Sequence, residues 1–281
     1  LWQRIRQQLV FDVPNVQRVQ SQRNWYASHP EYLDRVAKRA EPYLHLIVEE
    51  LERREMPIDL ALLPIVESAF DPFAYSHGSA SGVWQFIPGT ARQYGLDINW
   101  WYDGRRDVFA ATHAALDYLE ALYRYFDGNW MHALAAYNSG EGRVGNAIRR
   151  NKRAGKPTDF WNLDLPRETR AYVPKLLALA DILANSEKYG ITWYPIENQP
   201  MLEVVEAPAQ IDLALAADMA DLSLEELHQF NSGYNRWATA PDGPHRFLLP
   251  AENAERFSLA LQESEPKDWL SWTRHKVKSG E

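Results

Sequence analysis

The sequence predicts a mainly α-helical protein that ends in a small α+β module. Two observations support this fold class. Apolar residues recur at helical spacing through most of the first 190 residues, where alternating strand-like patterns are scarce. Beyond the proline-containing stretch 194–200, two short apolar-alternating runs enclose two short helical patterns. With 281 residues, the chain is long enough for one large domain or two of moderate size.

The longest helical pattern lies between two breaks, Pro30 and Met56-Pro57, and predicts one amphipathic helix over 31–55. Its apolar positions follow a helical spacing: Leu33, Val36, Ala37, Ala40, Leu44, Ile47, Val48 and Leu51. Residues 1–30 show a similar spacing and predict helices that pack on the domain that follows.

Further helices are predicted at 108–126, with Asp107 as the N-cap, at 130–137 and at 169–187. Clusters of Gly and Pro predict irregular segments at 76–89, 102–106 and 138–145. Such loops are where binding and catalytic residues tend to gather, so we expect the functional site there.

After residue 200 the order of patterns is strand, helix, helix, strand. The runs are 202–205, 213–219, 224–230 and 247–250, and they predict a compact βααβ unit. The excess of acidic residues also lies mostly in this part of the chain, which indicates two units with different surfaces.

Composition excludes several classes of protein. The net charge of -8 argues against a broad nucleic-acid footprint, and no apolar run is long enough for a membrane-spanning helix. The chain has no cysteine, which excludes disulfide scaffolds, zinc ribbons and thiol nucleophiles. Aromatic residues make up 12% of the chain, with 11 Trp, and sugar-binding clefts commonly use such rings as apolar platforms.

Metal and cofactor motifs are absent from the sequence. There is no His-Glu-x-x-His, no phosphate loop and no Gly-x-Ser-x-Gly elbow. His45 and Glu49, and likewise His113 and Asp117, are four residues apart, and lone pairs at that spacing are more typical of exposed ion pairs than of ligand sets. We therefore predict no metal and no cofactor.

Glu67 is the one acid inside the apolar run from Leu60 to Phe70. On a helix its neighbours three and four residues away are mostly apolar, and such surroundings raise the pKa of a carboxyl so that it can donate a proton near neutral pH. Pro64 weakens the interpretation as a plain helix, because proline kinks an interior turn. The alternative, a solvent-facing glutamate on an amphipathic helix, stays open at this point.

Four short motifs follow one another along the chain. They are Glu67-Ser68, Gly82 to Phe86 with Ile87 to Ala91 after it, Ala136 to Gly140, and Glu168 to Val173. Together, over residues 55–190, they resemble the family 1 lytic transglycosylases, which have a lysozyme-like fold and cleave the glycan strands of bacterial peptidoglycan. The closest resemblance is to the membrane-bound lytic murein transglycosylase D group.

The resemblance implies that Glu67 is the sole catalytic acid/base. It would protonate the oxygen between N-acetylmuramic acid and N-acetylglucosamine, and then deprotonate the muramic 6-hydroxyl to give a 1,6-anhydromuramoyl end. Ordinary glycoside hydrolysis needs a second carboxylate. Asp71, one turn from Glu67, is a candidate, but its position before Pro72 is more typical of a cap or turn former.

The matching motif positions imply a set of substrate-binding residues. Ser76 and Gln85 would hydrogen-bond the sugars next to the cut, and Ile87 would form an apolar wall. Tyr137 would hydrogen-bond Glu67, and Asn138 and Tyr172 would line the groove. From the residues alone, the favoured interpretations are a core tyrosine for Tyr137, a helix C-cap for Asn138 and a first-turn charge for Glu168.

The C-terminal unit resembles a degenerate LysM module, a small fold that binds N-acetylglucosamine-containing glycans. It departs from the usual pattern at 209–212, where the usual Gly-Asp or Gly-Glu before the first helix is missing. These patterns predict the following division of the chain: 1–54, an N-terminal helical segment; 55–193, the catalytic domain; 194–200, a linker; 201–265, the LysM-like module with a further helix; 266–281, the start of a truncated LysM repeat.

The leading hypothesis is a lytic transglycosylase of the periplasm that acts on peptidoglycan and has no nucleic-acid partner. From the resemblance we expect attachment to the outer membrane of a Gram-negative bacterium by a lipid anchor outside this chain, and cell-wall proteins as regulators. Two alternatives remain: a lysozyme-like muramidase, which would be a hydrolase, and a peptidoglycan-binding protein without turnover.

Overall fold

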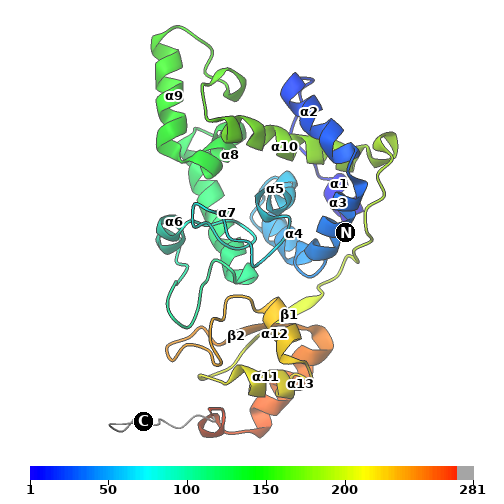
Figure 1. The fold of residues 1–281 in the computed structure, drawn as a ribbon, viewed down its shortest axis with the longest axis vertical. Helices are drawn as coiled ribbons and strands as arrows, with labels where there is room; N and C mark the ends of the chain where they lie inside the picture. The colour runs from blue at the N-terminus through cyan, green and yellow to red at the C-terminus, as the bar shows by residue number, and fades with distance from the viewer. Residues whose placement is uncertain (271–281) are drawn as a thin grey trace, which may run out of the picture.

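The structure is a computed structural model that describes residues 1–270. One large hydrophobic core draws on residues from Trp2 to Ile196, and a smaller one lies mainly in the C-terminal module. Figure 1 shows α1 to α10 in the upper part of the molecule and the module with strands β1 and β2 below them. The predicted class, mainly α with a small α+β module, is confirmed.

The upper part is built from helices of very different length. Its α-helices are α1 (Trp2–Arg6), α2 (Gln17–Ala27), α3 (Pro30–Ala40), α4 (Leu44–Arg53), α5 (Leu63–Ser68), α6 (Pro88–Gln93), α7 (Val108–Tyr125), α8 (Trp130–Ser139), α9 (Glu141–Arg153) and α10 (Arg167–Ala184). Short 3₁₀ helices are η1 (Ile58–Leu62), η2 (Phe160–Asn162) and η3 (Ser186–Tyr189).

The long helices α7 and α10 frame the site. Helix α10 packs along α2 and α8, while α7 packs against α8 and α4. Side-chain caps set where α7 and α8 begin: Asp107 accepts a hydrogen bond from Ala110 N (2.9 Å) and Asn129 accepts one from His132 N (3.0 Å). The helices predicted at 108–126, 130–137 and 169–187 are confirmed as α7, α8 and α10, with small differences at their ends.

Two predictions about the helices were wrong. The helix predicted over 31–55 is two helices, α3 and α4, separated by a turn that contains Pro42, which cannot donate a helical hydrogen bond. Residues 138–145, predicted to be irregular, contain only a one-residue turn at Gly140 (φ +87°) before α9 begins. Buried Val144 and Ala147 give α9 an apolar face that its glycines obscure in the sequence.

The C-terminal module has the predicted βααβ order. Strand β1 (Leu202–Glu206) pairs antiparallel with β2 (Arg246–Pro250), with Leu202 opposite Pro250. Between them lie α11 (Leu213–Met219) and α12 (Leu224–Phe230), and after them come α13 (Ala251–Glu263) and η4 (Pro266–Asp268).

Residues just beyond the predicted module belong to its core. Trp269 is buried in the smaller hydrophobic core, and its carbonyl accepts a hydrogen bond from Asp212 N (2.9 Å). Part of the truncated repeat predicted at 266–281 therefore packs on the module itself, and its remainder, 271–281, lies outside the described residues.

One carboxylate takes part in the contacts that join the module to the helices α1 to α10. Besides capping α7, Asp107 accepts hydrogen bonds from Tyr102 Oη (2.7 Å) and from the guanidinium of Arg246 on β2 (2.7 Å). All three side chains are mostly or fully shielded from water, which strengthens this contact. Within residues 1–270, no helix has the length and apolar character needed to cross a lipid bilayer.

Candidate active site

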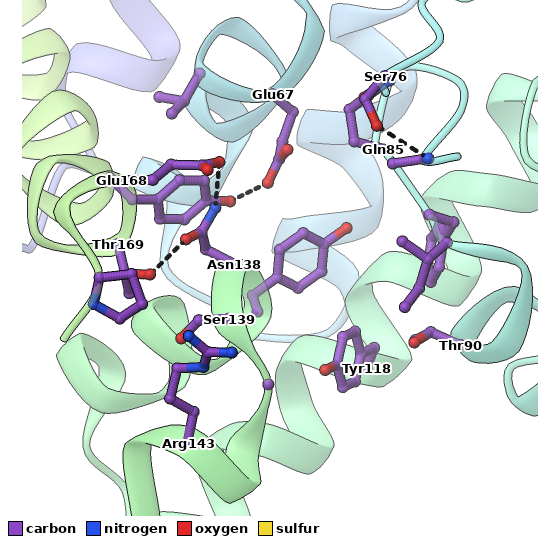
Figure 2. A pocket seen from close by; sticks show the side chains of 18 of the residues that line it. Glu67, Ser76, Gln85, Thr90, Tyr118, Asn138, Ser139, Arg143, Glu168 and Thr169 are labelled. Carbon is purple, nitrogen blue, oxygen red and sulfur yellow. Dashed lines mark hydrogen bonds between the residues drawn. The ribbon is translucent and has the colours of Figure 1, made fainter. Parts of the chain in front are cut away.

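A groove with a volume of about 650 Å³ opens between α5, α6, α8 and the start of α10. Every site residue predicted from the sequence lines it: Glu67, Ser76, Gln85, Ile87, Tyr137, Asn138 and Tyr172. Figure 2 shows Glu67 reaching into the groove from α5, with Ser76 and Gln85 on one side and Asn138, Glu168 and Thr169 on the other. Segments far apart in the sequence thus meet around one carboxyl.

Local sequence explains how Glu67 comes to project into the groove. The 3₁₀ helix η1 precedes α5, so Pro64 stands in the first turn of α5, where its missing N–H costs nothing. Helix α5 ends directly after the glutamate, because Ala69 (φ 52°) and Phe70 (φ 56°) are both left-handed. Two successive non-glycine residues with positive φ are a backbone strain of the kind found at functional sites.

The surroundings of Glu67 favour its neutral form. Burial of the carboxyl raises its pKa to about 8, and the negative charge of Glu168 adds to the rise. A hydrogen bond donated by Tyr172 Oη and the charge of Lys175 act in the opposite direction. The interpretation of Glu67 as a freely solvated surface glutamate is wrong, since its side chain is half-buried in the groove. Near neutral pH this carboxyl holds a proton that it can donate.

The hydrogen bond to Glu67 comes from Tyr172 of α10 and not from Tyr137, as the resemblance had suggested. Tyr137 Oη instead donates to the carbonyl oxygen of Trp84 (2.8 Å), which holds the turn before Gln85 against α8. Burial raises the pKa of both tyrosine hydroxyls well above the usual value, so both remain neutral donors. Both tyrosines line the same groove, and only their positions in the structure show which group accepts the hydrogen bond from each hydroxyl.

Ser76 and Gln85 lie on a loop that folds back on itself. Ser76 Oγ accepts a hydrogen bond from Ala80 N (3.0 Å), and Gln85 Nε2 donates to the carbonyl of Gly82 (2.8 Å). Gln85 has a positive φ (51°), which turns its side chain into this arrangement. The amide nitrogen is thus occupied within the described part of the chain, and the side-chain oxygen remains for a ligand. Ile87 is 50% exposed at the groove edge.

Asn138 connects α8 to α10. Its Oδ1 accepts a hydrogen bond from Thr169 Oγ1 (2.8 Å), and its Nδ2 donates to Glu168 Oε1 (3.2 Å), as the dashed lines in Figure 2 show. Asn138 is therefore a helical residue of α8, one position before its end, and not a C-cap. This bridge keeps the charge of Glu168 beside the groove, where it raises the pKa of Glu67.

A second carboxylate for hydrolysis is not supplied by Asp71. Its Oδ1 accepts a hydrogen bond from Phe73 N (2.9 Å) in a turn, and it lines a separate depression beside α3. The acids that share the groove with Glu67 are Glu141 and Glu168.

Two of the histidines lie beside a glutamate, and burial lowers the pKa of both imidazoles. His45 lies 3.6 Å from Glu49, as the spacing suggested, whereas His113 lies 3.4 Å from Glu50 rather than beside Asp117. Among residues 1–270, no three His, Asp or Glu side chains are grouped as a metal site.

The sequence alone assigned no function to three residues that line the groove or hold its walls in place. Ser68 Oγ donates to the carbonyl of Val83 (2.9 Å) and so ties α5 to the loop of Gln85. Thr169 positions Asn138, and Lys175 acts on the charge of Glu67. The signal for Lys175 was present in the sequence, because it follows Tyr172 by three residues on one helix and faces the same side.

Most of the groove lies on a stretch of chain that matches a known domain, and its residues from α10 follow that stretch. Residues 46–160 match the model described as "Transglycosylase SLT domain", and residues 201–265 match "Lytic transglycosylase MltD, LysM-like domain". The chain is 44% identical over 265 residues to membrane-bound lytic murein transglycosylase D of Escherichia coli K12, covering 94% of this chain and 59% of that protein.

Two further proteins are similar to parts of the chain. Peptidoglycan transglycosylase gp16 of Escherichia phage T7 is 36% identical over 118 residues, covering 41% of this chain and 8% of that protein. The solved structure of the 70 kDa soluble lytic transglycosylase from Escherichia coli is 21% identical, with a TM-score of 0.43, covering 63% of this chain and 32% of that one.

The fold and the matched domain define the class as that of proteins with a lysozyme-like SLT domain. The chain carries an SLT transglycosylase domain followed by a LysM-like domain of the kind described for lytic transglycosylase MltD, and it is similar to the membrane-bound lytic murein transglycosylase D group. It spans about three fifths (59%) of the length of its relative from Escherichia coli K12.

Proposed function

We propose that this chain is a lytic transglycosylase that cleaves the bond between N-acetylmuramic acid and N-acetylglucosamine in peptidoglycan. The observation that carries the proposal is the carboxyl of Glu67, which lines the groove and whose pKa is raised to about 8 by burial. The matched SLT domain and the name of the relative from Escherichia coli support the same activity.

The reaction needs one group that first donates a proton and then accepts one. The protonated Glu67 carboxyl donates its proton to the glycosidic oxygen as the C1–O bond of the muramic residue breaks. The carboxylate formed then takes the proton of the muramic 6-hydroxyl, and that oxygen bonds to C1 to close a 1,6-anhydro ring. No water is consumed, and Glu67 ends protonated as it began.

Tyr172 and Glu168 shift the pKa of Glu67 in opposite directions. The hydrogen bond from Tyr172 stabilises the carboxylate that exists between the two proton transfers, whereas Glu168 stabilises the protonated form that begins the cycle. A pKa near the working pH suits a group that must both give and take a proton.

The remaining groove residues would bind the sugars on either side of the cut. Ser76 and the side-chain oxygen of Gln85 are placed to meet polar sugar substituents, and exposed Ile87 to meet an apolar sugar face. Asn138 would act mainly by holding α8 and α10 together at the groove floor.

We assign the parts of the chain as follows: 1–54 as a helical segment packed on the catalytic domain, 55–193 as the catalytic domain, 194–200 as a linker, 201–265 as a degenerate LysM-like module with a further helix, and 266–281 as the start of a truncated LysM repeat. The name of the relative from Escherichia coli, a membrane-bound enzyme, supports a periplasmic location with attachment to the outer membrane, through a lipid anchor outside this chain. Cell-wall proteins would restrain the activity.

A muramidase is the second candidate, because Glu141 and Glu168 line the same groove and either would be the second carboxylate that hydrolysis needs. A hydrolase would release products with a reducing end, heavier than anhydro products by one water. The pairing of Glu168 with Asn138 favours a fixed electrostatic role for it over activation of water.

The test is to digest sacculi with the purified chain and to identify the soluble products by mass spectrometry. We expect anhydromuropeptides from the wild type and from Glu168→Gln, and none from Glu67→Gln. Hydrated products that disappear in Glu168→Gln would establish the muramidase instead. Full activity of Glu67→Gln would refute the role of Glu67, and sacculus binding without products from any chain would indicate a binding protein.

A further inference from the structure

Two large exposed aromatic side chains lie together where the helical part meets the module. Trp100 is 53% exposed and Trp237 is 46% exposed, and their ring centroids are 5.6 Å apart. The ring of Trp101 contacts both, at 4.7 and 5.2 Å. Soluble proteins seldom leave adjoining apolar surfaces of this size in water unless they bind something.

The rings come from two loops that are fixed to each other. Trp100 and Trp101 belong to the loop between α6 and α7, and Trp237 to the loop between α12 and β2; Figure 1 shows these loops approaching each other on the side of α6. The carbonyl of Trp101 accepts a hydrogen bond from Asn235 N (2.8 Å), and its N–H donates to Asn99 Oδ1 (2.8 Å). A ligand would therefore meet a surface already ordered, at little entropic cost.

A cation completes the surface. The guanidinium of Arg236 lies 4.2 Å from the ring centroid of Trp100, and its Nη1 donates to the carbonyl of Asn235 (3.0 Å). Its buried Nε has no hydrogen-bond partner among residues 1–270. Indole faces stack on the C–H faces of sugar rings, and a guanidinium attracts carboxylates. The two features together fit a glycan that carries acidic peptide stems.

The loop that carries Trp100 and Trp101 is also fixed to the groove wall. Arg105, on the loop that carries Trp100, donates from Nη1 to the carbonyls of Ser79 (2.7 Å) and Phe86 (3.4 Å), and forms a buried ion pair with Asp103 (2.7 Å). Ser79 and Phe86 flank the loop segment that holds Gln85 in the groove. These bonds hold the loop of the tryptophans and the wall of the groove in a fixed relation to each other.

We propose that Trp100, Trp101, Trp237 and Arg236 form a second binding surface for peptidoglycan glycan strands, outside the groove and built from both parts of the chain. The inference rests on the proposed function for the identity of the polymer. A strand held at both places leaves the protein slowly, because rebinding at one place is intramolecular while the other holds.

Binding is tested without cleavage by placing every variant in the Glu67→Gln protein and measuring its co-sedimentation with sacculi. We expect Trp100→Ala combined with Trp237→Ala to weaken binding about tenfold, through lost stacking and lost avidity. The matched control is Trp25→Ala, which removes an indole of equal exposure (46%) from α2, away from both loops, and should bind like its parent. Melting curves followed by circular dichroism establish that each variant is folded.

Equal binding by the double variant and its parent would overturn the proposal. It would indicate that the exposed tryptophans bind a protein partner instead. Absence of binding by the parent itself would also overturn it, whereas the product analysis with active enzyme would still decide the proposed function. In the active protein, we expect the double variant to lose more activity on intact sacculi than on short soluble strands. An equal loss on both would indicate damage to the groove and refute a second surface.

Discussion

Replacing Glu67 with glutamine should stabilise the folded protein, and by an amount that depends on pH. The carboxyl has a pKa of about 8 in the folded protein against 4.5 as the reference value. Between these values the native chain keeps a proton that the unfolded chain has lost, so unfolding becomes easier as the pH rises. The glutamine variant has no such proton, and its amide oxygen still accepts the hydrogen bond from Tyr172.

The size of the effect follows from the width of this pH window. Each pH unit between the two pKa values is worth ~1.4 kcal/mol, so at pH 7 the variant should be more stable than the wild type by an amount on the order of 3 kcal/mol. Below pH 4.5 the two free energies of unfolding should converge, because the unfolded wild type then regains the proton that the native state keeps. Above pH 8 the difference should level off, since native Glu67 ionises as well.

Urea denaturation of both proteins between pH 4.5 and pH 8.5 measures this difference directly. Glu52→Gln is a control of opposite sign, because the hydrogen bond from Arg4 lowers the pKa of Glu52 and its contribution to stability is present at pH 7. That variant should be less stable than the wild type at neutral pH. A difference between Glu67→Gln and wild type that stays the same from pH 4.5 to pH 7 would refute our account of the carboxyl environment.

Three further variants test the site and its support. In Tyr172→Phe, loss of the hydrogen bond that stabilises the Glu67 carboxylate should raise the pKa of Glu67, and so move the alkaline limb of the pH profile of kcat/KM upward by about one unit. In Gly82→Ala, the new Cβ would lie 1.8 Å from the carbonyl oxygen of Arg105 at a φ of +83°, so thermal denaturation should show a Tm lower by more than about 5 °C. In Arg105→Met, buried Asp103 loses its ion pair at 2.7 Å and keeps only Arg106 Nε at 3.9 Å, and urea denaturation should show a loss of about 3 kcal/mol.

Each of these expectations has an outcome that contradicts it. An unmoved alkaline limb in Tyr172→Phe, or an equal shift in Tyr137→Phe, would show that the hydroxyl of Tyr172 does not act on the charge of Glu67. A Gly82→Ala protein with the wild-type Tm would mean that the loop yields without cost. For Arg105→Met, adding Asp103→Leu should recover much of the lost free energy of unfolding. No recovery would show that the weakly paired carboxylate of Asp103 is not the cause of the loss.

The sequence predicted the helical framework because apolar spacing and caps are local signals. Asp107 stands directly before an apolar-periodic run, a pattern typical of an N-cap, and it does cap α7. The break at Pro42 was missed, because the apolar spacing continues in phase across it. The start of α9 was missed because glycines near Gly140 indicated a loop, whereas a buried apolar face decided the outcome.

Within the site, motifs placed the right residues in one groove but did not determine their partners. Tyr137 and Tyr172 are both neutral hydroxyl donors on groove helices, and their sequence positions carry no information about the direction of each side chain. The support of Gln85 by its own loop depends on backbone angles at positive φ, for which a glutamine gives no signal. Long-range geometry of this kind comes only from packing.

Asp107 makes hydrogen bonds in both parts of the chain, and this limits how such proteins can be rearranged during evolution. One oxygen caps a helix of the groove part, and the other receives Tyr102 and, from the module, Arg246. A recombination event that exchanged the module for another would leave a shielded carboxylate without its cation. The two parts should therefore be inherited together in this lineage, and a graft should succeed only if it brings an arginine to the same place.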